Sequence, residues 1–393
     1  MLARRPGRRL VGRCGRVLAA PLLLAAALAT VGSVTAASAA TCENWTGAQP
    51  PNNGGGATQL LGVTVLPGCT AWAVGDDFTP HDGDVGLIER WNGAAWQQVS
   101  SPNPGVATFL SGVRAISPAN AWAVGSFTTQ TREKPLTLHW DGHTWRQVMS
   151  PSPGTLSELT GVSAVSAHDV WAVGDDFSDS DHKSPVALHW NGTKWSQVTT
   201  PALGTSSELA GVTATSHSNA WAVGESTSGG VTSTLILHWD GHHWQRMASP
   251  HPGASSGLSA VGGSSAANAW AVGSSTAGGV STTLVLHWNG HRWQRVASPS
   301  PAPQGNSSFL DSVTVPSASA AFAVGGYVAG GQSKTLLLRW NGRKWSQLAS
   351  PNPAASNQFM QFFAVGASSA RDAWTVGVSG GEHTFQALAI HCC

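Results

Sequence analysis

Two short segments of the sequence concentrate carboxylates, which bind hard cations and accept hydrogen bonds from sugar hydroxyls. Both follow a Trp-Ala-Val-Gly motif, whereas later copies of that motif are followed by Gly, Ser and Thr. The segments could hold Ca²⁺ or a glycan, or they could be solvated loops whose charges keep the protein soluble. The lack of EF-hand spacing favours solvated loops, and no other cofactor is expected. The candidate ligand-binding residues are Asp76, Asp77, Asp82 and Asp84 in the first segment and Asp175, Asp176, Asp179 and Asp181 in the second.

Histidine recurs at one repeated position, which raises the question of a zinc site. Zinc needs three or four ligands that converge on one point. Equivalent residues of a circular repeat lie far apart unless they face its axis, and Arg90 and Arg339 occupy the same position in two copies. We therefore expect packing between repeats, and no metal, for His139, His189, His238 and His287.

These residues belong to a repeat that spans most of the chain. The Trp-Ala-Val-Gly motif recurs every 49 to 52 residues, and a Trp-(Asn/Asp)-Gly-x-x-Trp motif follows each full copy. Fixed periods of this length are typical of solenoids, propellers and arrays. The first motif starts at Trp72, Trp122, Trp171, Trp221, Trp270, Phe322 and Trp374.

Each copy contains four strand-like runs, here called a to d. In the third copy these begin near Leu159, Val170, Val186 and Trp195, and run c alternates apolar and polar residues. Asn191-Gly192 between runs c and d is a strong hairpin signal. A two-residue loop there would pair Trp190 with Thr193 and place Trp190 and Trp195 diagonally on one face.

Four antiparallel strands per repeat predict an all-β chain that forms a seven-bladed β-propeller. Residues 42–52 resemble the last strand of a repeat, and residues 362–393 supply only strands a to c. We expect the N-terminal strand to close the last blade. Within a propeller at 41–393, blades one to six are expected at about 59–101, 109–150, 158–200, 208–249, 257–298 and 309–350. The tryptophans are expected to form the core of each blade.

Residues 1–40 have the pattern of a secretory signal peptide. Six arginines precede an apolar run from Val17 to Val31, and either Ala37-Ser38-Ala39 or Ser38-Ala39-Ala40 fits a cleavage site. The run is too short to favour a membrane anchor, and the paired arginines leave Sec and twin-arginine export both open.

Without the leader, the chain has 15 basic and 20 acidic residues, which argues against a nucleic-acid partner. We expect a secreted monomer with no membrane span.

Four cysteines follow the leader, and an exported protein can oxidise them. Alignment with the repeat places Cys42 and the Cys392-Cys393 pair around the missing turn of the last blade. Of three connectivities, the expected one pairs Cys42 with Cys393 and Cys69 with Cys392.

The combined motif Asn-Trp-Ala-Val-Gly and Leu-His-Trp-Asn-Gly-x-x-Trp-x-x-Val resembles the tectonin repeat, and more loosely the kelch repeat. The resemblance implies a propeller, and characterised tectonin proteins are largely glycan-binding lectins. Here the repeat is longer, with the additional residues between strands b and c.

The sequence favours a binding protein over an enzyme. No Ser-His-Asp, Cys-His or paired-carboxylate arrangement recurs at a meaningful spacing, and Tyr327 is the single tyrosine. We expect a non-catalytic propeller that recognises a glycan or an extracellular surface protein through loops on one rim. The first alternative is a structural or protein-interaction scaffold, and the less favoured one is a propeller hydrolase or lyase. The identity of the ligand is left open.

Overall fold

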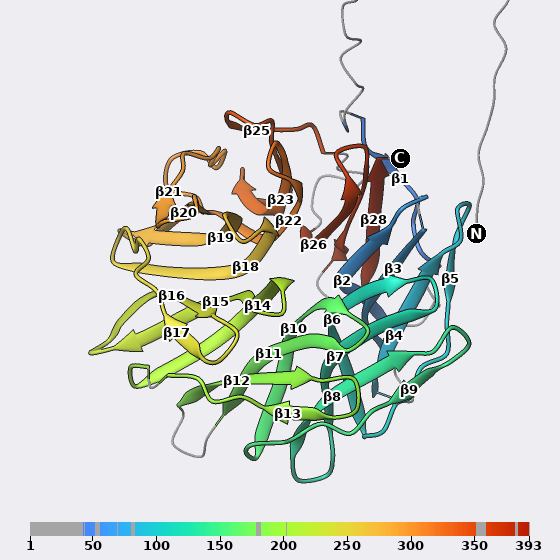
Figure 1. The fold of residues 1–393 in the computed structure, drawn as a ribbon. Coiled ribbons are helices and arrows are strands. Elements are labelled where there is room, and N and C mark those ends of the chain that lie inside the picture. Colours follow the sequence, from blue (N-terminus) through green and yellow to red (C-terminus); the bar gives the residue numbers. More distant parts are fainter. Residues whose placement is uncertain are drawn as a thin grey trace, which may run out of the picture. The chain divides into compact units, whose positions relative to one another are not determined.

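The computed structural model describes residues 42, 44–51, 56–68, 70–79, 83–177, 182–201, 203–350, 359–381 and 384–392. Every regular element in these ranges is a β-strand, as the sequence predicted (Figure 1). No helix in the described ranges is long and apolar enough to cross a membrane. The predicted signal peptide at residues 1–40 lies outside these ranges and stays a prediction.

The strands form four-stranded antiparallel units, numbered here 1 to 7 along the chain. The strands in position a are β2 (Ala57–Leu66), β6 (Ala107–Ser117), β10 (Leu156–Ser166), β14 (Ser206–Ser216), β18 (Ser255–Ser265), β22 (Ser308–Ser317) and β26 (Phe359–Ser369). Those in position b are β3 (Thr70–Thr79), β7 (Asn120–Thr128), β11 (Asp169–Phe177), β15 (Asn219–Ser228), β19 (Asn268–Ala277), β23 (Ala320–Ala329) and β27 (Asp372–Gly381).

Positions c and d complete each unit. The strands in position c are β4 (Gly83–Trp91), β8 (Glu133–Trp140), β12 (Lys183–Trp190), β16 (Val231–Trp239), β20 (Val280–Trp288), β24 (Gln332–Trp340) and β28 (Thr384–Cys392). The short strands in position d are β5 (Trp96–Gln98), β9 (Trp145–Gln147), β13 (Trp195–Gln197), β17 (Trp244–Arg246), β21 (Trp293–Arg295), β25 (Trp345–Gln347) and β1 (Thr46–Gly47).

Unit 7 is built from both ends of the described chain. Strand β1 pairs with β28, with Thr46 opposite His391 and Gly47 opposite Ile390, and Figure 1 shows the two strands side by side. Units 2 and 3 are joined by one parallel bridge between Glu133 and Leu156, which merges them into an eight-stranded sheet. The N-terminal strand therefore occupies the position that the sequence predicted for it.

The turn between strands c and d is longer than predicted. Trp190 lies directly opposite Trp195, so the two-residue loop and the diagonal placement of the tryptophans were wrong. The reason is the side chain of Asn191, whose Oδ1 accepts hydrogen bonds from the amides of Thr193 (3.0 Å) and Lys194 (3.1 Å). Gly192 adopts a positive φ of 94°, which closes the four-residue turn without strain.

The tryptophans pack between neighbouring units and not only inside each one. The strand b ring of Trp171 lies 4.9 Å from the rings of Trp239 and Trp244 in the next unit. The same arrangement joins unit 7 to unit 1, where Trp374 lies 4.8 Å from both Trp91 and Trp96. The prediction that each blade has its own tryptophan core is corrected accordingly: these large rings hold adjacent sheets together.

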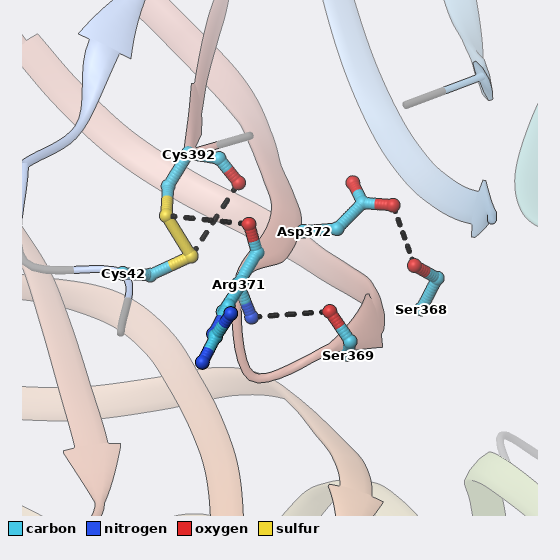
Figure 2. Close-up of a disulfide and its surroundings, with 6 residues drawn as sticks. All are labelled: Cys42, Ser368, Ser369, Arg371, Asp372 and Cys392. Atoms are coloured by element: carbon cyan, nitrogen blue, oxygen red, sulfur yellow. Dashed lines mark hydrogen bonds between the residues drawn. A yellow bond between two sulfur atoms is a disulfide. The ribbon is translucent and has the colours of Figure 1, made fainter. Parts of the chain in front are cut away.

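The structure pairs Cys42 with Cys392, so the predicted Cys42–Cys393 and Cys69–Cys392 disulfides were both wrong (Figure 2). Cys392 takes the place of the strand c tryptophan, and successive side chains of a strand point to opposite faces. In unit 3 the indole of that tryptophan, Trp190, donates to the carbonyl of Ala167 at 3.2 Å. In unit 7 the backbone amide of Cys42 donates to the equivalent carbonyl, that of Ala370, also at 3.2 Å. The disulfide thus fills the space of the missing indole. Cys69 and Cys393 lie outside the described residues.

Candidate functional site

One edge of every unit gathers the start of strand a, the end of strand b and the start of strand c. In unit 3, Leu156 pairs with Phe177, and Phe177 pairs with Lys183. We call this edge the b–c rim. Most of the acidic residues singled out from the sequence lie on it, because the strands extend into the segments that were expected to be loops.

The first acidic segment is part of the sheet. Asp76 is 5% exposed and accepts hydrogen bonds from the amide of Gln59 at 3.1 Å, while Asp77 is equally buried and accepts one from the hydroxyl of Thr58 at 2.7 Å. Burial raises the pKa of Asp76 to about 6; the Gln59 hydrogen bond opposes this, and Asp84 and Asp77 add to it. These two aspartates are therefore structural partners of strand β2 more than solvated loop residues. Asp84 lies in β4 opposite Phe78, and Asp82 is outside the described residues.

The second acidic segment contributes to a charged cluster across units 3 and 4. The ammonium of Lys183 lies 2.6 Å from a carboxylate oxygen of Glu208 and 3.5 Å from one of Asp175. Asp175 is 4% exposed, and burial raises its pKa although Lys183 opposes the shift. Asp176 accepts a hydrogen bond from Ser157 at 2.6 Å, and Asp179 and Asp181 lie outside the described residues.

Three further carboxylates of this cluster were not anticipated. Glu158 pairs in register with Asp175, and Glu208 with Glu225. Burial raises the pKa of Glu158 and Glu225, and neighbouring carboxylates raise both further. A column-by-column comparison of the repeats could have found them, since the strand a position is acidic only in units 3 and 4. Asp76 belongs to another unit, and none of its electrostatic partners is shared with Asp175.

We call the charged cluster of Glu158, Asp175, Lys183, Glu208 and Glu225 the acidic groove. Two small cavities open beside it. One has a volume of about 250 Å³ and is lined by Lys183, Glu208 and Glu225 together with Phe177 and small hydroxyl residues. The other has a volume of about 210 Å³ and shares Glu208 and Glu225 with the first. Carboxylates, an ammonium and hydroxyls on adjacent cavity walls can bind a ligand that carries hydroxyl or amino groups.

An apolar hollow lies on the same rim between units 6 and 7. It has a volume of about 720 Å³ and is lined by Phe309, Phe359 and Phe385 and by two Gly-Gly pairs. The rings of Phe359 and Phe385 are 5.8 Å apart and edge to face, and Phe359 is 39% exposed. Exposed aromatic rings provide flat apolar contact surfaces. Nothing in the repeat motif pointed to this hollow, because the phenylalanines come from three different repeat positions.

The repeated histidines have a structural role: they pack mainly within their own unit, and some also contact the next unit as expected, such as His189 with His217 at 6.4 Å. The His189 ring lies 4.5 Å from that of Trp171 on the neighbouring strand, and its Nε2 is 2.8 Å from Asp169. Where strand b begins with asparagine, its side-chain oxygen takes the place of that carboxylate, as Asn219 does for His238 at 2.8 Å. Burial lowers the pKa of His139, His238, His287 and His391.

In the described ranges no group of three or more His, Cys, Asp and Glu side chains is placed to hold a metal ion. The carboxylates of the first acidic segment face Gln59 and Thr58, and those of the second face Lys183 and Ser157. The Ca²⁺ site considered from the sequence also involves Asp82, Asp179 and Asp181, outside the described ranges.

Comparison with known proteins places the chain among β-propeller-like structures. No protein-family model and no curated protein sequence matches it. A structure described as YCF48 bound to D1 peptide is 15% identical and covers 88% of this chain and 96% of its own, with a TM-score of 0.53. YCF48 from Cyanidioschyzon merolae is 14% identical over 88% of this chain and 98% of its own, with a TM-score of 0.52. An ulvan lyase bound to -[GlcA(1-4)Rha3S]- is 10% identical over 88% of this chain and 95% of its own, also with a TM-score of 0.52. At these identities the likeness concerns the fold: an all-β chain of repeated four-stranded antiparallel sheets.

Proposed function

We propose that the chain is a secreted, non-catalytic, monomeric seven-bladed β-propeller that binds a glycan or cell-surface ligand through its b–c rim. Closure of the ring is supported by two contacts of unit 7. Trp374 packs against Trp91 and Trp96 of unit 1, and on the other side Trp45 lies 5.8 Å from Phe322 of unit 6. The same aromatic contact that joins consecutive units therefore joins the last unit to the first.

The acidic groove is the observation that carries the binding function. Its cavities bring Glu208 and Glu225 together, and the first of them adds Lys183, the one lysine at its repeat position. Glu225 is half-buried, and no hydrogen bond joins its carboxylate to another described residue, so it is available to a ligand. Shallow polar cavities of this kind suit sugar hydroxyls, in line with the tectonin-like motif.

A protein partner is the second candidate. The apolar hollow formed by Phe309, Phe359 and Phe385 offers exposed aromatic surface, which is enriched in protein interfaces. One of the similar structures is bound to a peptide and another to a saccharide, so both ligand classes occur on similar folds.

The paired register of Glu208 and Glu225 also keeps a hydrolase in view. Glycosidases use two carboxylates, one of them with a raised pKa as the general acid. Burial raises the pKa of Glu225, as required of the general acid. Release of reducing sugar from a ligand identified by binding would establish this alternative.

A glycan array with the secreted protein tests the proposal. We expect Glu225→Gln and Glu208→Gln to reduce binding at least tenfold. Asp240→Asn is the matched control, because Asp240 caps a c–d turn at the opposite edge and Asn191 caps the equivalent turn. If the parent binds no glycan above background, the glycan ligand is refuted and the aromatic hollow becomes the surface to test. N-terminal sequencing of the exported protein tests cleavage after the leader.

A further inference from the structure

A second cavity lies among the strands in position a, away from the b–c rim. It has a volume of about 320 Å³ and is lined by residues from the ends of all these strands that lead into the a–b turns. One repeat position contributes a residue from every unit. In chain order these residues are Thr64, Arg114, Ser163, Thr213, Gly262, Thr314 and Gly366. Six of them are small, so Arg114 is a departure from the repeat.

Arg114 is the single charged residue in the lining. Its side chain is exposed to the cavity, and no ion pair or hydrogen bond joins it to another described side chain. Desolvation by the surrounding strands lowers the pKa of the guanidinium, although the side chain is accessible from the cavity. The positive charge is therefore held in a confined space without an anion from the described residues.

The neighbouring units show what this position does when it is not arginine. The hydroxyl of Thr64 accepts a hydrogen bond from the amide of Ala115 at 3.3 Å, and that of Ser163 accepts one from Ala214 at 2.9 Å. Each of these bonds ties one unit to the next. A guanidinium has no acceptor atom, so Arg114 cannot make that tie. Its presence at this position is not explained by the architecture.

A layer of valines lies between Arg114 and Asp311. Asp311 lines a further cavity of about 170 Å³ and accepts a hydrogen bond from Gln361 at 2.7 Å. The same valines line both cavities and so lie between them: Val63, Val113, Val162, Val212, Val261, Val313 and Val365. Asp311 is therefore screened from Arg114 by an apolar layer, and its charge is not placed to neutralise the arginine.

We propose that the cavity binds an oxyanion on the guanidinium of Arg114. A guanidinium presents paired N–H donors that match carboxylate, phosphate and sulfate oxygens. The hydroxyls of Thr64 and Ser163 use their acceptor side for the amides of the next unit, so their protons remain to donate to the anion. Thr213 and Thr314 bring two more hydroxyls to the lining. At about 30 Å³ per water, the volume corresponds to about ten waters, which suits a small oxyanion or the acidic end of a chain.

The test compares the parent with Arg114→Thr, which restores the residue found in units 1, 4 and 6 and should fold normally. Calorimetric titration with phosphate, sulfate and succinate is expected to show saturable binding to the parent and at least a tenfold loss in Arg114→Thr. Arg114→Lys should retain the charge but bind more weakly, since it lacks the paired donors. Sulfate and phosphate also stabilise proteins without binding, and the Thr variant corrects for that effect in thermal melts.

A short acidic peptide and a glucuronate oligosaccharide distinguish a free anion from a carboxylate carried on a longer partner. Binding of these ligands that depends on Arg114 would also support the oxyanion site and identify the second source. Equal binding of all probes by the parent and by Arg114→Thr, with both variants folded, would overturn the proposal.

Discussion

Glu89 occupies a core position at which all other units have leucine or isoleucine, and replacing it with leucine should stabilise the protein. The side chain is fully buried, and neither carboxyl oxygen has a hydrogen-bond partner among the described residues. The equivalent residues are also fully buried: Leu138, Leu188, Leu237, Leu286, Leu338 and Ile390. Glu89 shares its strand face with Leu87 and Trp91, which pack in one cluster with Trp374 of unit 7.

The magnitude has two parts. Burial raises the pKa of Glu89 from 4.5 to about 7. At 1.36 kcal/mol per pKa unit, ionisation of the buried carboxyl costs about 3 kcal/mol of the free energy of unfolding. The neutral carboxyl still leaves buried polar atoms unpaired, which costs about 1–3 kcal/mol at any pH.

The direction of the pH dependence follows from proton binding. Between pH 4.5 and 7 the folded state holds a proton on Glu89 that the unfolded state has released, so Glu89 lowers stability as pH rises through this window. Above pH 7 the loss is complete and no longer changes. The free energy of unfolding of Glu89→Leu should therefore exceed that of the parent by about 1–3 kcal/mol at pH 4. At pH 8 the difference should be about 3 kcal/mol larger.

Urea unfolding followed by tryptophan fluorescence, at pH values from 4 to 8 and with the disulfide intact, measures this difference. Glu89→Gln is the matched control, because it keeps the shape and the unpaired polar atoms but removes the titration. Glu89→Gln should be more stable to urea than the parent only above pH 5. If the difference between Glu89→Leu and the parent is the same at pH 4 and pH 8, the carboxyl does not titrate in this window and the reasoning is refuted. A leucine variant less stable than the parent would mean that Glu89 has a partner.

Three further expectations rest on other parts of the fold. Cys392→Ser should lower stability by up to about 5 kcal/mol, because its disulfide with Cys42 spans 350 residues, whereas Cys393→Ser should have no effect in the same urea titration. Trp239→Ala should cost about 3–5 kcal/mol, since the ring packs on Trp171 of the preceding unit; an unchanged melting midpoint would contradict the role of the tryptophans between units. Burial raises the pKa of Asp311 to about 7, so Asp311→Asn should reduce the loss of stability between pH 4 and 7 and leave stability at pH 4 unchanged.

The fold was predictable because the repeat states it several times. Each copy shows the same apolar alternation and the same Asn-Gly or Asp-Gly turn, so a misreading of one copy is corrected by the others. The turn length was not predictable, since Asn-Gly serves both a two-residue hairpin and the wider turn that Asn191 closes with its side chain. The disulfide partner of Cys42 was likewise not predictable, because two cysteines are adjacent in the sequence. Spacing does not tell Cys392 from Cys393, whereas the strand face does.

The candidate site was predictable only in part. The aspartates at positions 76, 77, 175 and 176 follow a recognisable motif, but their burial depends on Gln59, Thr58, Lys183 and Ser157, which come from other strands. The sequence distances between these partners, 19 residues for Thr58 and Asp77, carry no signal of their own. Glu208 and Glu225 were missed for the same reason: they meet across two strands, and the cavity exists only because unit 5 packs beside them.

Residues that differ from their equivalents in the other repeats can indicate function. Whether they do depends on what the side chain faces. A repeat offers nearly the same environment at every equivalent position, so the fold does not account for one residue that differs from six others. Glu89 faces only packed side chains, and its departure lowers stability without creating a place for a ligand. Arg114 faces a cavity, where a charged group can be compensated by a bound partner. The stability of Glu89→Leu and the ligand binding of Arg114→Thr should therefore change independently, and a stabilised Glu89→Leu protein that keeps full oxyanion binding would support this distinction.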